Sequence, residues 1–240
     1  MPLIVAVAGC KGAGKSSFSR LLVNSLLNDV PCVMYMDTDC GQPEYGAPGM
    51  LSLHALSEPA LGPPHTHPRP PIAAHFVGDV SPQSDPDRYA AAVAALYEHY
   101  ATVGRDPHTG AWAPLVVNTH GWVKSLGLEL LARVLATLAP SHVVQLLLAQ
   151  DKKNLPLEPF WCQDPATCHT HVLGIPSCNP HAGAEHHHQQ GGGASTSGGG
   201  GAAAGPPGGA RVPRALKPVE GRALLWHGWA KQCLGLDPAW

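Results

Sequence analysis

A surplus of charge of one sign is what this sequence most clearly lacks. Fifteen Lys and Arg residues stand against 17 Asp and Glu in 240 residues, so the formal net charge is −2. This balance excludes a chain that is basic throughout, and any contact with nucleic acid has to come from a local patch. No apolar run is long enough to cross a bilayer, and no basic segment precedes the first one, which argues against a signal peptide. We therefore expect a soluble, intracellular protein with no membrane partner.

The sequence also lacks a regular cysteine framework. Seven cysteines, an odd number, are scattered along the chain, which fits a reducing compartment better than a secreted protein. A structural zinc site is disfavoured, because the candidate ligands match no paired C-x₂-C spacing. Those candidates are Cys162, Cys168, His169, His171 and Cys178.

Glycine and proline, in contrast, are abundant. They number 27 and 25, well above ordinary usage, so we expect part of the chain not to be folded. Residues 176–213 carry most of this bias and read as a low-complexity, disordered linker. A run of three histidines at 186–188 lies in the linker; adventitious metal binding and a purely compositional tract both explain it, and we favour the second.

A phosphate-binding loop occurs close to the start of the sequence. Residues 9–16, GCKGAGKS, match G-x-x-x-x-G-K-[ST] between an apolar run at 3–8 and an amphipathic segment. The glycines allow the backbone amides to surround phosphate oxygens, and the helix dipole adds positive charge. Lys15 is expected to reach the β- and γ-phosphates and Ser16 to ligate Mg²⁺. The expected nucleotide-binding residues are Gly9, Gly12, Ala13, Gly14, Lys15, Ser16 and Ser17.

Strand-like and helix-like segments alternate along the first 150 residues. Strands are predicted at 3–8, 30–36, 73–77, 115–117 and 142–148, and helices after the phosphate-binding loop, at 85–100 and at 126–138. In the first helix, Phe18, Leu21, Leu22 and Leu26 have helical spacing. This order predicts an α/β fold of the P-loop NTPase class, with a mainly parallel sheet flanked by helices. Residues 1–150 form this domain, 151–175 an unassigned connector, and 214–240 a short helical tail.

Two further polar clusters directly follow predicted strands, where ligands of parallel sheets bind. The first contains Asp37, Asp39 and Gln42, and a carboxylate there is able to hold hydrated Mg²⁺ or accept a proton. We expect only one of the two aspartates to face the nucleotide. A simple Asx-turn is the alternative.

The second cluster contains Thr119, Gly121 and Trp122. Gly121 permits close backbone approach, and Trp122 offers a stacking surface of the kind that grips single-stranded nucleic acid. A core role for Trp122 is the alternative. Other P-loop classes fit less well: the N-K-x-D motif that reads guanine is absent, and Lys11 precedes Lys15 by four residues, whereas partitioning-type ATPases need five.

Together these motifs resemble the polynucleotide 5′-hydroxyl-kinase family, most closely its nucleolar, ribosomal-RNA-processing branch, which is related to the cleavage-factor-associated RNA 5′-kinase. The resemblance covers nearly all of residues 3–148. The matching stretches are 9–18, 35–44, 48–49, 52–53, 61–64, 78–79, 81–82, 85–89 and 114–131.

The resemblance implies transfer of the γ-phosphate of ATP to the 5′-hydroxyl of an RNA end, with Mg²⁺ as cofactor and a nucleolar location. The family's D-x-x-Q falls on Asp39 and Gln42, which implies that Lys15, Asp39 and Gln42 are catalytic and that Ser16 and Asp39 bind the metal. The family's clasp, T-x-G-W, falls on Thr119, Gly121 and Trp122 and implies that they bind the RNA end. An RNA-processing endonuclease is an implied partner.

Three departures from the family pattern stand out. Family members usually carry another domain before the phosphate-binding loop, whereas Met1 lies almost on it. Ser125 stands where the clasp helix usually has glycine, which we take as a mild change. The arginine-bearing lid has only a weak counterpart in residues 216–229, where Arg222 is the expected substrate-binding residue. An ATP-binding scaffold without turnover and a small-molecule kinase therefore remain as alternatives.

Overall fold

The computed structural model describes residues 2–162, 168–177 and 217–233, and these contain a seven-stranded sheet with flanking helices. The strands lie in the order β4-β3-β2-β5-β1-β6-β7. Strands β1, β2, β5, β6 and β7 are mutually parallel, whereas β3 runs antiparallel to both of its neighbours. The strands are β1 (Ile4–Ala8), β2 (Val33–Asp37), β3 (Met50–Leu56), β4 (Ala73–Phe76), β5 (Leu115–Asn118), β6 (His142–Leu147) and β7 (His171–Pro176).

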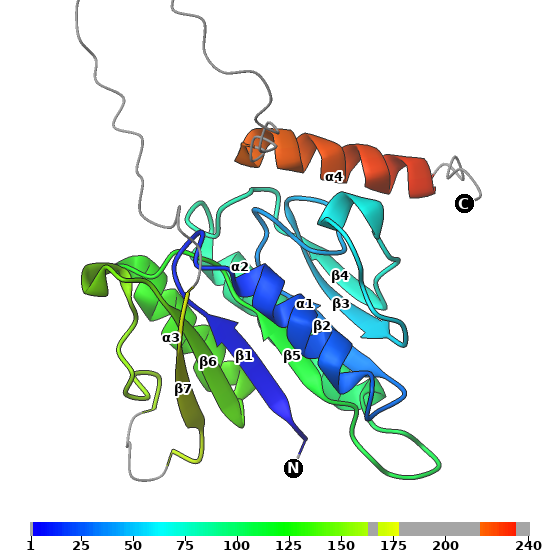
Figure 1. The fold of residues 1–240 in the computed structure, drawn as a ribbon, viewed down its shortest axis with the longest axis horizontal. Helices are drawn as coiled ribbons and strands as arrows, with labels where there is room; N and C mark the ends of the chain where they lie inside the picture. Colours follow the sequence, from blue (N-terminus) through cyan, green and yellow to red (C-terminus); the bar gives the residue numbers. More distant parts are fainter. Residues whose placement is uncertain (1, 163–167, 178–216, 234–240) are drawn as a thin grey trace, which may run out of the picture.

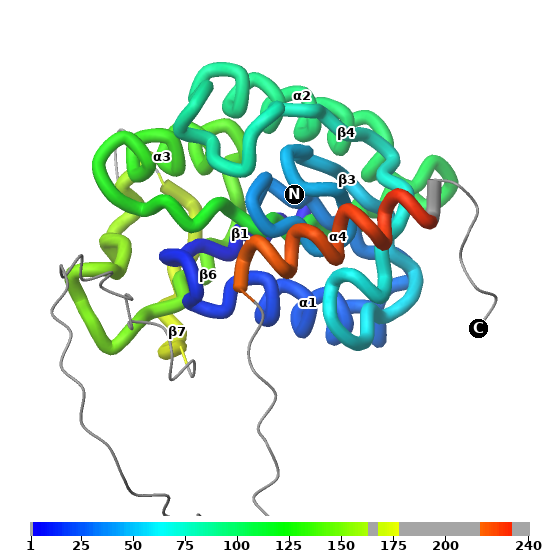
Figure 2. Tube along the Cα trace, turned by 90° about the horizontal axis from the view of Figure 1, so that it is seen from above, coloured from blue at the N-terminus to red at the C-terminus, as the bar shows by residue number. Residues whose placement is uncertain are grey.

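Helices cover both faces of the sheet, as the alternation of segments predicts. Helix α1 (Lys15–Leu26) lies on one face, and α2 (Pro86–Val103) and α3 (Leu126–Leu138) lie together on the other (Figure 2). Helix α4 (Pro218–Cys233) is separate from these layers and lies above the ends of the strands (Figure 1). Two short 3₁₀ turns, η1 (Pro64–Thr66) and η2 (Asp151–Lys153), complete the described elements. The predicted α/β fold with a mainly parallel sheet is confirmed.

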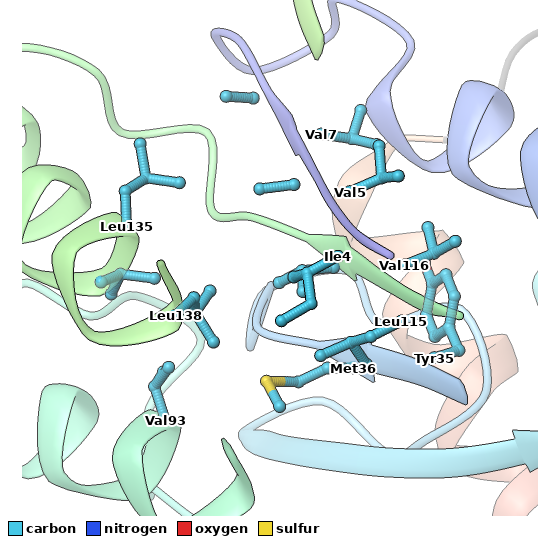
Figure 3. Close-up of a cluster of buried hydrophobic side chains, with 14 of the residues drawn as sticks. Ile4, Val5, Val7, Tyr35, Met36, Val93, Leu115, Val116, Leu135 and Leu138 are labelled. Carbon is cyan, nitrogen blue, oxygen red and sulfur yellow. The ribbon is translucent and has the colours of Figure 1, made fainter. Parts of the chain in front are cut away.

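The core fills both faces of the central strands, because neighbouring residues of a strand point to opposite sides. Figure 3 shows Ile4 and Met36 on the side of Val93, Leu135 and Leu138, which come from α2 and α3. Strands β1, β2 and β5 are buried along their whole length, as expected for parallel strands covered on both faces. The site residues that follow these strands therefore start from a rigid base.

The first helix differs in detail from the predicted pattern. Phe18, Leu22 and Leu26 pack against the core as their spacing suggests, whereas Leu21 is 63% exposed. The fully buried residues of the helix are instead Ser19 and Val23. Helix α2 begins as predicted, with the Asp85 carboxylate accepting a hydrogen bond from the Arg88 amide at 3.0 Å, and continues to Val103.

Two strands were not expected from the sequence. Strand β3 has polar residues at two buried positions, Ser52 and His54, which hydrogen-bond to each other at 2.9 Å and so break the apolar pattern of a strand. Strand β7 lies in the segment that we left unassigned, and its last residue, Pro176, falls within the predicted linker. It pairs in parallel with β6 along six residues at the edge of the sheet.

The remaining predictions for the C-terminal part are tested only in places. Residues 178–213 of the predicted linker, with the histidine run and Cys178, lie outside the described residues. Helix α4 falls inside the predicted helical tail. Cys162 and Cys168, two of the disfavoured zinc ligands, are joined as a disulfide, a pairing that the reducing-compartment expectation did not include. In the described part of the chain, no helix is long and apolar enough to span a membrane.

Candidate active site

The phosphate-binding loop connects β1 to α1 at the edge of the sheet where the parallel strands end. Gly14 caps the helix with a φ of 95°, and Gly9 and Gly12 also have positive φ, so this backbone path needs glycine. The loop backbone therefore has the conformation that surrounds a phosphate, with the N-terminus of α1 directed at it.

The ammonium group of Lys15 is buried within this loop. Its Nζ donates a hydrogen bond to the Cys10 carbonyl at 3.3 Å. Burial lowers the pKa of Lys15, and the nearby negative charge of Asp39 acts in the opposite direction. A buried cation beside a loop of amides is an electrostatic partner for phosphate oxygens.

Asp37, the last residue of β2, holds the loop that follows it. Its fully buried carboxylate accepts hydrogen bonds from the Glu44 amide at 2.6 Å, the Asn118 side chain at 3.1 Å and the Asp39 amide at 3.2 Å. Burial raises the pKa of Asp37 to about 8, and the hydrogen bonds lower it. Asn118 also lies 3.5 Å from the Ser16 hydroxyl, so Asp37 connects the two strand ends to the phosphate-binding loop.

Asp39 lies two residues after Asp37 and is partly exposed. One of its oxygens accepts hydrogen bonds from the amides of Gly41 at 3.0 Å and Gln42 at 3.2 Å, which is the Asx-turn that we considered as the alternative. The turn does not remove Asp39 from the site, since its charge acts on Lys15. Gln42 is exposed and lines a pocket together with Ser16.

The segment after β5 packs directly on the phosphate-binding loop. The Gly121 carbonyl accepts a hydrogen bond from the Lys11 amide at 3.1 Å, and a Cβ at position 121 would lie 2.9 Å from Lys11 Cα and 3.1 Å from Lys15 Nζ. Only glycine fits there. The Thr119 hydroxyl is fully buried and donates to the Val7 carbonyl at 2.8 Å, so it ties β5 to β1.

The structure supports the core role of Trp122, and its role as a stacking surface stays a prediction. The residue is half-buried, and its indole packs against Gly127 at the start of α3 at a distance that leaves no room for a side chain there. Part of the ring is therefore committed to the core. Ser125, between these residues, has a φ of 49° and ψ of −129°, a region that suits glycine, so its presence is a larger departure than the mild one expected.

His120 and Tyr89 belong to the surroundings of the site and were not predicted. His120 is 2% exposed, its Nδ1 accepts the Trp122 amide at 3.3 Å, and its ring lies edge-on to Tyr89. Burial and then the positive charge of Lys15 lower the pKa of His120 to about 4, so the imidazole is neutral. The Tyr89 hydroxyl donates to the Thr38 carbonyl at 2.6 Å, which secures the loop after β2 from α2.

Glu44 forms a second, buried centre of polar contacts at the end of that loop. It is 1% exposed, and its Oε1 lies 3.0 Å from both the Arg20 guanidinium and His67 Nε2. Arg20 also donates to the Gly62 carbonyl at 2.7 Å. Glu44 therefore connects α1, the loop after β2 (residues 38–44, which we call the acidic loop) and residues 62–67, the segment on which α4 lies.

Helix α4 covers this edge of the sheet (Figures 1 and 2). Leu225 is 6% exposed, and a Cβ at Gly228 would lie 3.1 Å from the His65 carbonyl, so these two residues make the contact. A pocket of about 260 Å³ lies between α4 and the loops. It is lined by Ser16, Gln42, Pro43, Glu44, Pro63, Pro64, His65, Lys217, Gly221 and Leu225. Arg222, the predicted substrate-binding residue, is half-buried and is not among them.

The missed residues left only weak signals in the sequence. Asn118 directly follows the predicted strand at 115–117, as Asp37 follows the one at 30–36, which does suggest that both lie at the same edge of the sheet. Glu44, Arg20 and His67 are far apart along the chain, and only the fold brings them together.

The chain is similar to several known proteins. The family model described as mRNA cleavage and polyadenylation factor CLP1 P-loop matches residues 9–159. Similar curated proteins include polynucleotide 5′-hydroxyl-kinase NOL9 from Arabidopsis thaliana, 43% identical over 179 residues, 73% of this chain and 49% of that protein. NOL9 from Bos taurus is 38% identical over 161 residues, 67% of this chain and 22% of that protein. The chain thus spans at most about half the length of these relatives.

Solved structures show the same fold. A Clp1p–Pcf11p complex aligns with a TM-score of 0.60 at 17% sequence identity, over 96% of this chain and 48% of that one. The match at residues 9–159 takes in the phosphate-binding loop, the acidic loop and the clasp. The chain therefore belongs to the CLP1 P-loop family.

Proposed function

We propose that this chain is an ATP-dependent polynucleotide 5′-hydroxyl kinase that phosphorylates the 5′ end of RNA in ribosomal RNA processing. The observation that carries the proposal is the contact between the clasp and the phosphate-binding loop, where Gly121 lies against Lys11 and Lys15. A segment suited to holding an acceptor is thus adjacent to the lysine that would hold the donor. The names of the curated relatives support the same activity.

Each of the proposed site residues has a different role in the reaction. The 5′-hydroxyl oxygen attacks the γ-phosphorus, the bond to the β–γ bridging oxygen breaks, and ADP leaves. Asp39 accepts the hydroxyl proton, and Gln42 orients the reacting groups. Lys15 and the loop amides balance the negative charge that shifts toward the β-phosphate. Most of the acceleration comes from positioning and charge stabilisation, as in phosphoryl transfer generally.

The residues near the loop also suit Mg²⁺. The Ser16 hydroxyl and the Asp39 carboxylate are hard oxygen donors of the type that this ion prefers. Bound there, Mg²⁺ would neutralise charge on the phosphates. Asp37, which is buried behind these residues, holds their loops in place.

A transfer assay with labelled ATP and a 5′-hydroxyl oligoribonucleotide tests the proposal. We expect wild type to label the oligonucleotide, and Lys15→Ala and Asp39→Ala to lose at least about a hundredfold in rate. Arg133→Ala is the matched control, because Arg133 is exposed on α3 and pairs only with exposed Asp87. Intact ATP binding by wild type without label transfer would reject the kinase.

One observation favours an alternative function, an ATP-binding scaffold for an RNA-processing nuclease. Among the residues that the structure describes, neither Arg222 nor any other arginine lines the pocket beneath α4. The same assay separates the two, since the scaffold binds ATP and transfers nothing. Transfer to a nucleoside but not to an oligonucleotide would instead indicate a small-molecule kinase.

The cellular setting follows from the proposed activity. We assign the protein to the nucleus and nucleolus, with an RNA-processing endonuclease as its protein partner, on the strength of the relatives named NOL9. Imaging of the tagged full chain together with a nucleolar marker tests the location.

A further inference from the structure

Helix α4 carries two side-chain stripes with different surroundings. Leu225 and Gly228 contact residues 62–68, and Gly221 faces the pocket above Ser16. The neighbouring stripe consists of Arg222, Trp226 and Trp229, which share one side of the helix because they are four and three residues apart. We call this second group the α4 stripe.

The α4 stripe presents aromatic surface beside the pocket. Trp226 and Trp229 lie edge to face with ring centroids 5.9 Å apart, and Trp226 remains 43% exposed. The exposed part of the Trp226 ring is not used in the packing of the domain. Its exposed surface is available to a ligand that reaches the pocket.

The charge of α4 indicates the chemistry of that ligand. The described part of the helix carries the basic residues Lys217, Arg222 and Lys231 against one acid, Glu220. The Glu220 carboxylate is used within the protein, accepting a hydrogen bond from the Lys217 amide at 2.7 Å. Basic side chains beside an exposed indole and a half-buried one match a single-stranded polynucleotide, whose phosphates and bases alternate.

Trp122 does not fulfil this role alone. Its indole is partly committed to Gly127, so the clasp offers a reduced stacking surface. The pocket lies between α4 and the loops below it, because Ser16 and Gln42 line it on one side and Lys217, Gly221 and Leu225 on the other. The clasp contacts the same phosphate-binding loop through the hydrogen bond from Lys11 to Gly121, so α4 and the clasp both adjoin that loop.

We propose that the α4 stripe of Arg222, Trp226 and Trp229 is a stacking track for the bases of single-stranded RNA adjacent to the 5′ end. This proposal rests on the proposed function, since it places RNA in the same site. It assigns substrate recognition to two tryptophans beyond the clasp. Because every base has a stacking face, the track accepts RNA without reading its sequence.

The test measures binding of a short 5′-hydroxyl oligoribonucleotide, labelled at its 3′ end, to the full chain by fluorescence anisotropy. We expect Trp226→Ala to weaken binding about 5- to 10-fold, at the lower end of what loss of one stacked base costs. Trp226→Phe should retain most of the affinity. Leu224→Ala is the matched control, because Leu224 is similarly exposed on another side of α4.

A second arm uses oligonucleotides in which the first few bases after the 5′ end are removed and the phosphates kept. Wild type should bind these abasic strands more weakly, and Trp226→Ala should bind intact and abasic strands alike, because both changes remove the same contact. Equal binding of intact RNA by wild type, Trp226→Ala and the double variant Trp226→Ala/Trp229→Ala would overturn the track. Absence of binding by wild type would do so as well.

Kinase activity, measured in parallel, separates the two proposals. Phosphate transfer with unchanged binding by the tryptophan variants rejects the track and keeps the kinase. Base-dependent binding without transfer rejects the kinase and keeps the track.

Discussion

The phosphate-binding loop and the helix above it are held in place by different kinds of contact. The loop is tied to the sheet by backbone and buried polar contacts, among them the hydrogen bond of 3.1 Å from the Lys11 amide to the Gly121 carbonyl. Helix α4 contacts the domain through Leu225 and the closely packed Gly228 on residues 62–68. We call the phosphate-binding loop with its buried contacts the floor of the site and helix α4 its cover. From the difference in contacts we expect the cover to detach without disturbing the floor.

The largest expected effect comes from breaking the floor at Glu44. Glu44→Ala leaves Arg20 and His67 facing each other without the buried carboxylate, and we expect a loss of about 3 kcal/mol in the free energy of unfolding. Urea denaturation measures it. Asp87→Ala, which breaks the exposed pair with Arg133, should cost less than about 0.5 kcal/mol. Similar losses in the two variants would show that the Glu44 centre does not stabilise the floor.

A second effect on the floor depends on pH. Burial lowers the pKa of both His54 and His120 to about 4, against an ordinary value of 6.5. The unfolded chain therefore takes up these protons at a higher pH than the folded chain does. As a result, the free energy of unfolding falls as pH drops from about 6.5 to about 4. Each histidine contributes at most about 1.4 kcal/mol per pH unit.

Urea denaturation across this pH range checks the effect. His54→Gln and His120→Gln should each make the dependence shallower, whereas exposed His108→Gln should not. An unchanged slope in both buried variants would contradict the lowered pKa values.

Removing the Leu225 contact of α4 should have a smaller effect, confined to the stability of that helix. Leu225→Ala costs α4 about 2 kcal/mol of docking energy, which corresponds to roughly a 30-fold faster hydrogen exchange of its amides. The amides of β1 and β5 should keep their protection. Leu224→Ala is the control. Faster exchange in β1 as well would mean that α4 and the sheet unfold as one unit.

The smallest expected effect concerns the strained backbone at Ser125, beside the clasp. Ser125→Gly relieves a backbone conformation with φ 49° and ψ −129° and should raise stability by about 1 kcal/mol, measured by thermal unfolding. Ala139→Gly, at φ 41° and ψ 56°, should gain less, because non-glycine residues tolerate that region better. A loss of stability in Ser125→Gly would show that the serine side chain makes a compensating contact.

The floor was largely predictable from the sequence, and the cover was not. The phosphate-binding loop is a local pattern, and three strand ends that carry polar residues have to meet at one edge of a parallel sheet. The two aspartates were harder to tell apart, because Asp37 ends β2, Asp39 lies two residues later, and only the fold shows that Asp37 is buried.

Longer-range arrangements left no local signal. Strand β3 was missed because Ser52 and His54 satisfy each other inside the protein, so a polar pair occupies positions where an apolar pattern was sought. The contact of α4 depends on residues 62–68, more than 150 positions earlier in the chain. Leu21 was assigned to the core by spacing alone, although Ser19 and Val23 occupy that face.

The hydrogen bond between Lys11 and Gly121 has a consequence for how the site is able to vary. It joins the phosphate-binding loop and the clasp, so a substitution that moves the clasp also moves Lys11 and Lys15. If the proposed function holds, selectivity for the nucleotide and selectivity for the acceptor end are therefore coupled in this fold. Changes in acceptor preference that spare nucleotide binding have to arise outside this joint, in residues that touch neither loop.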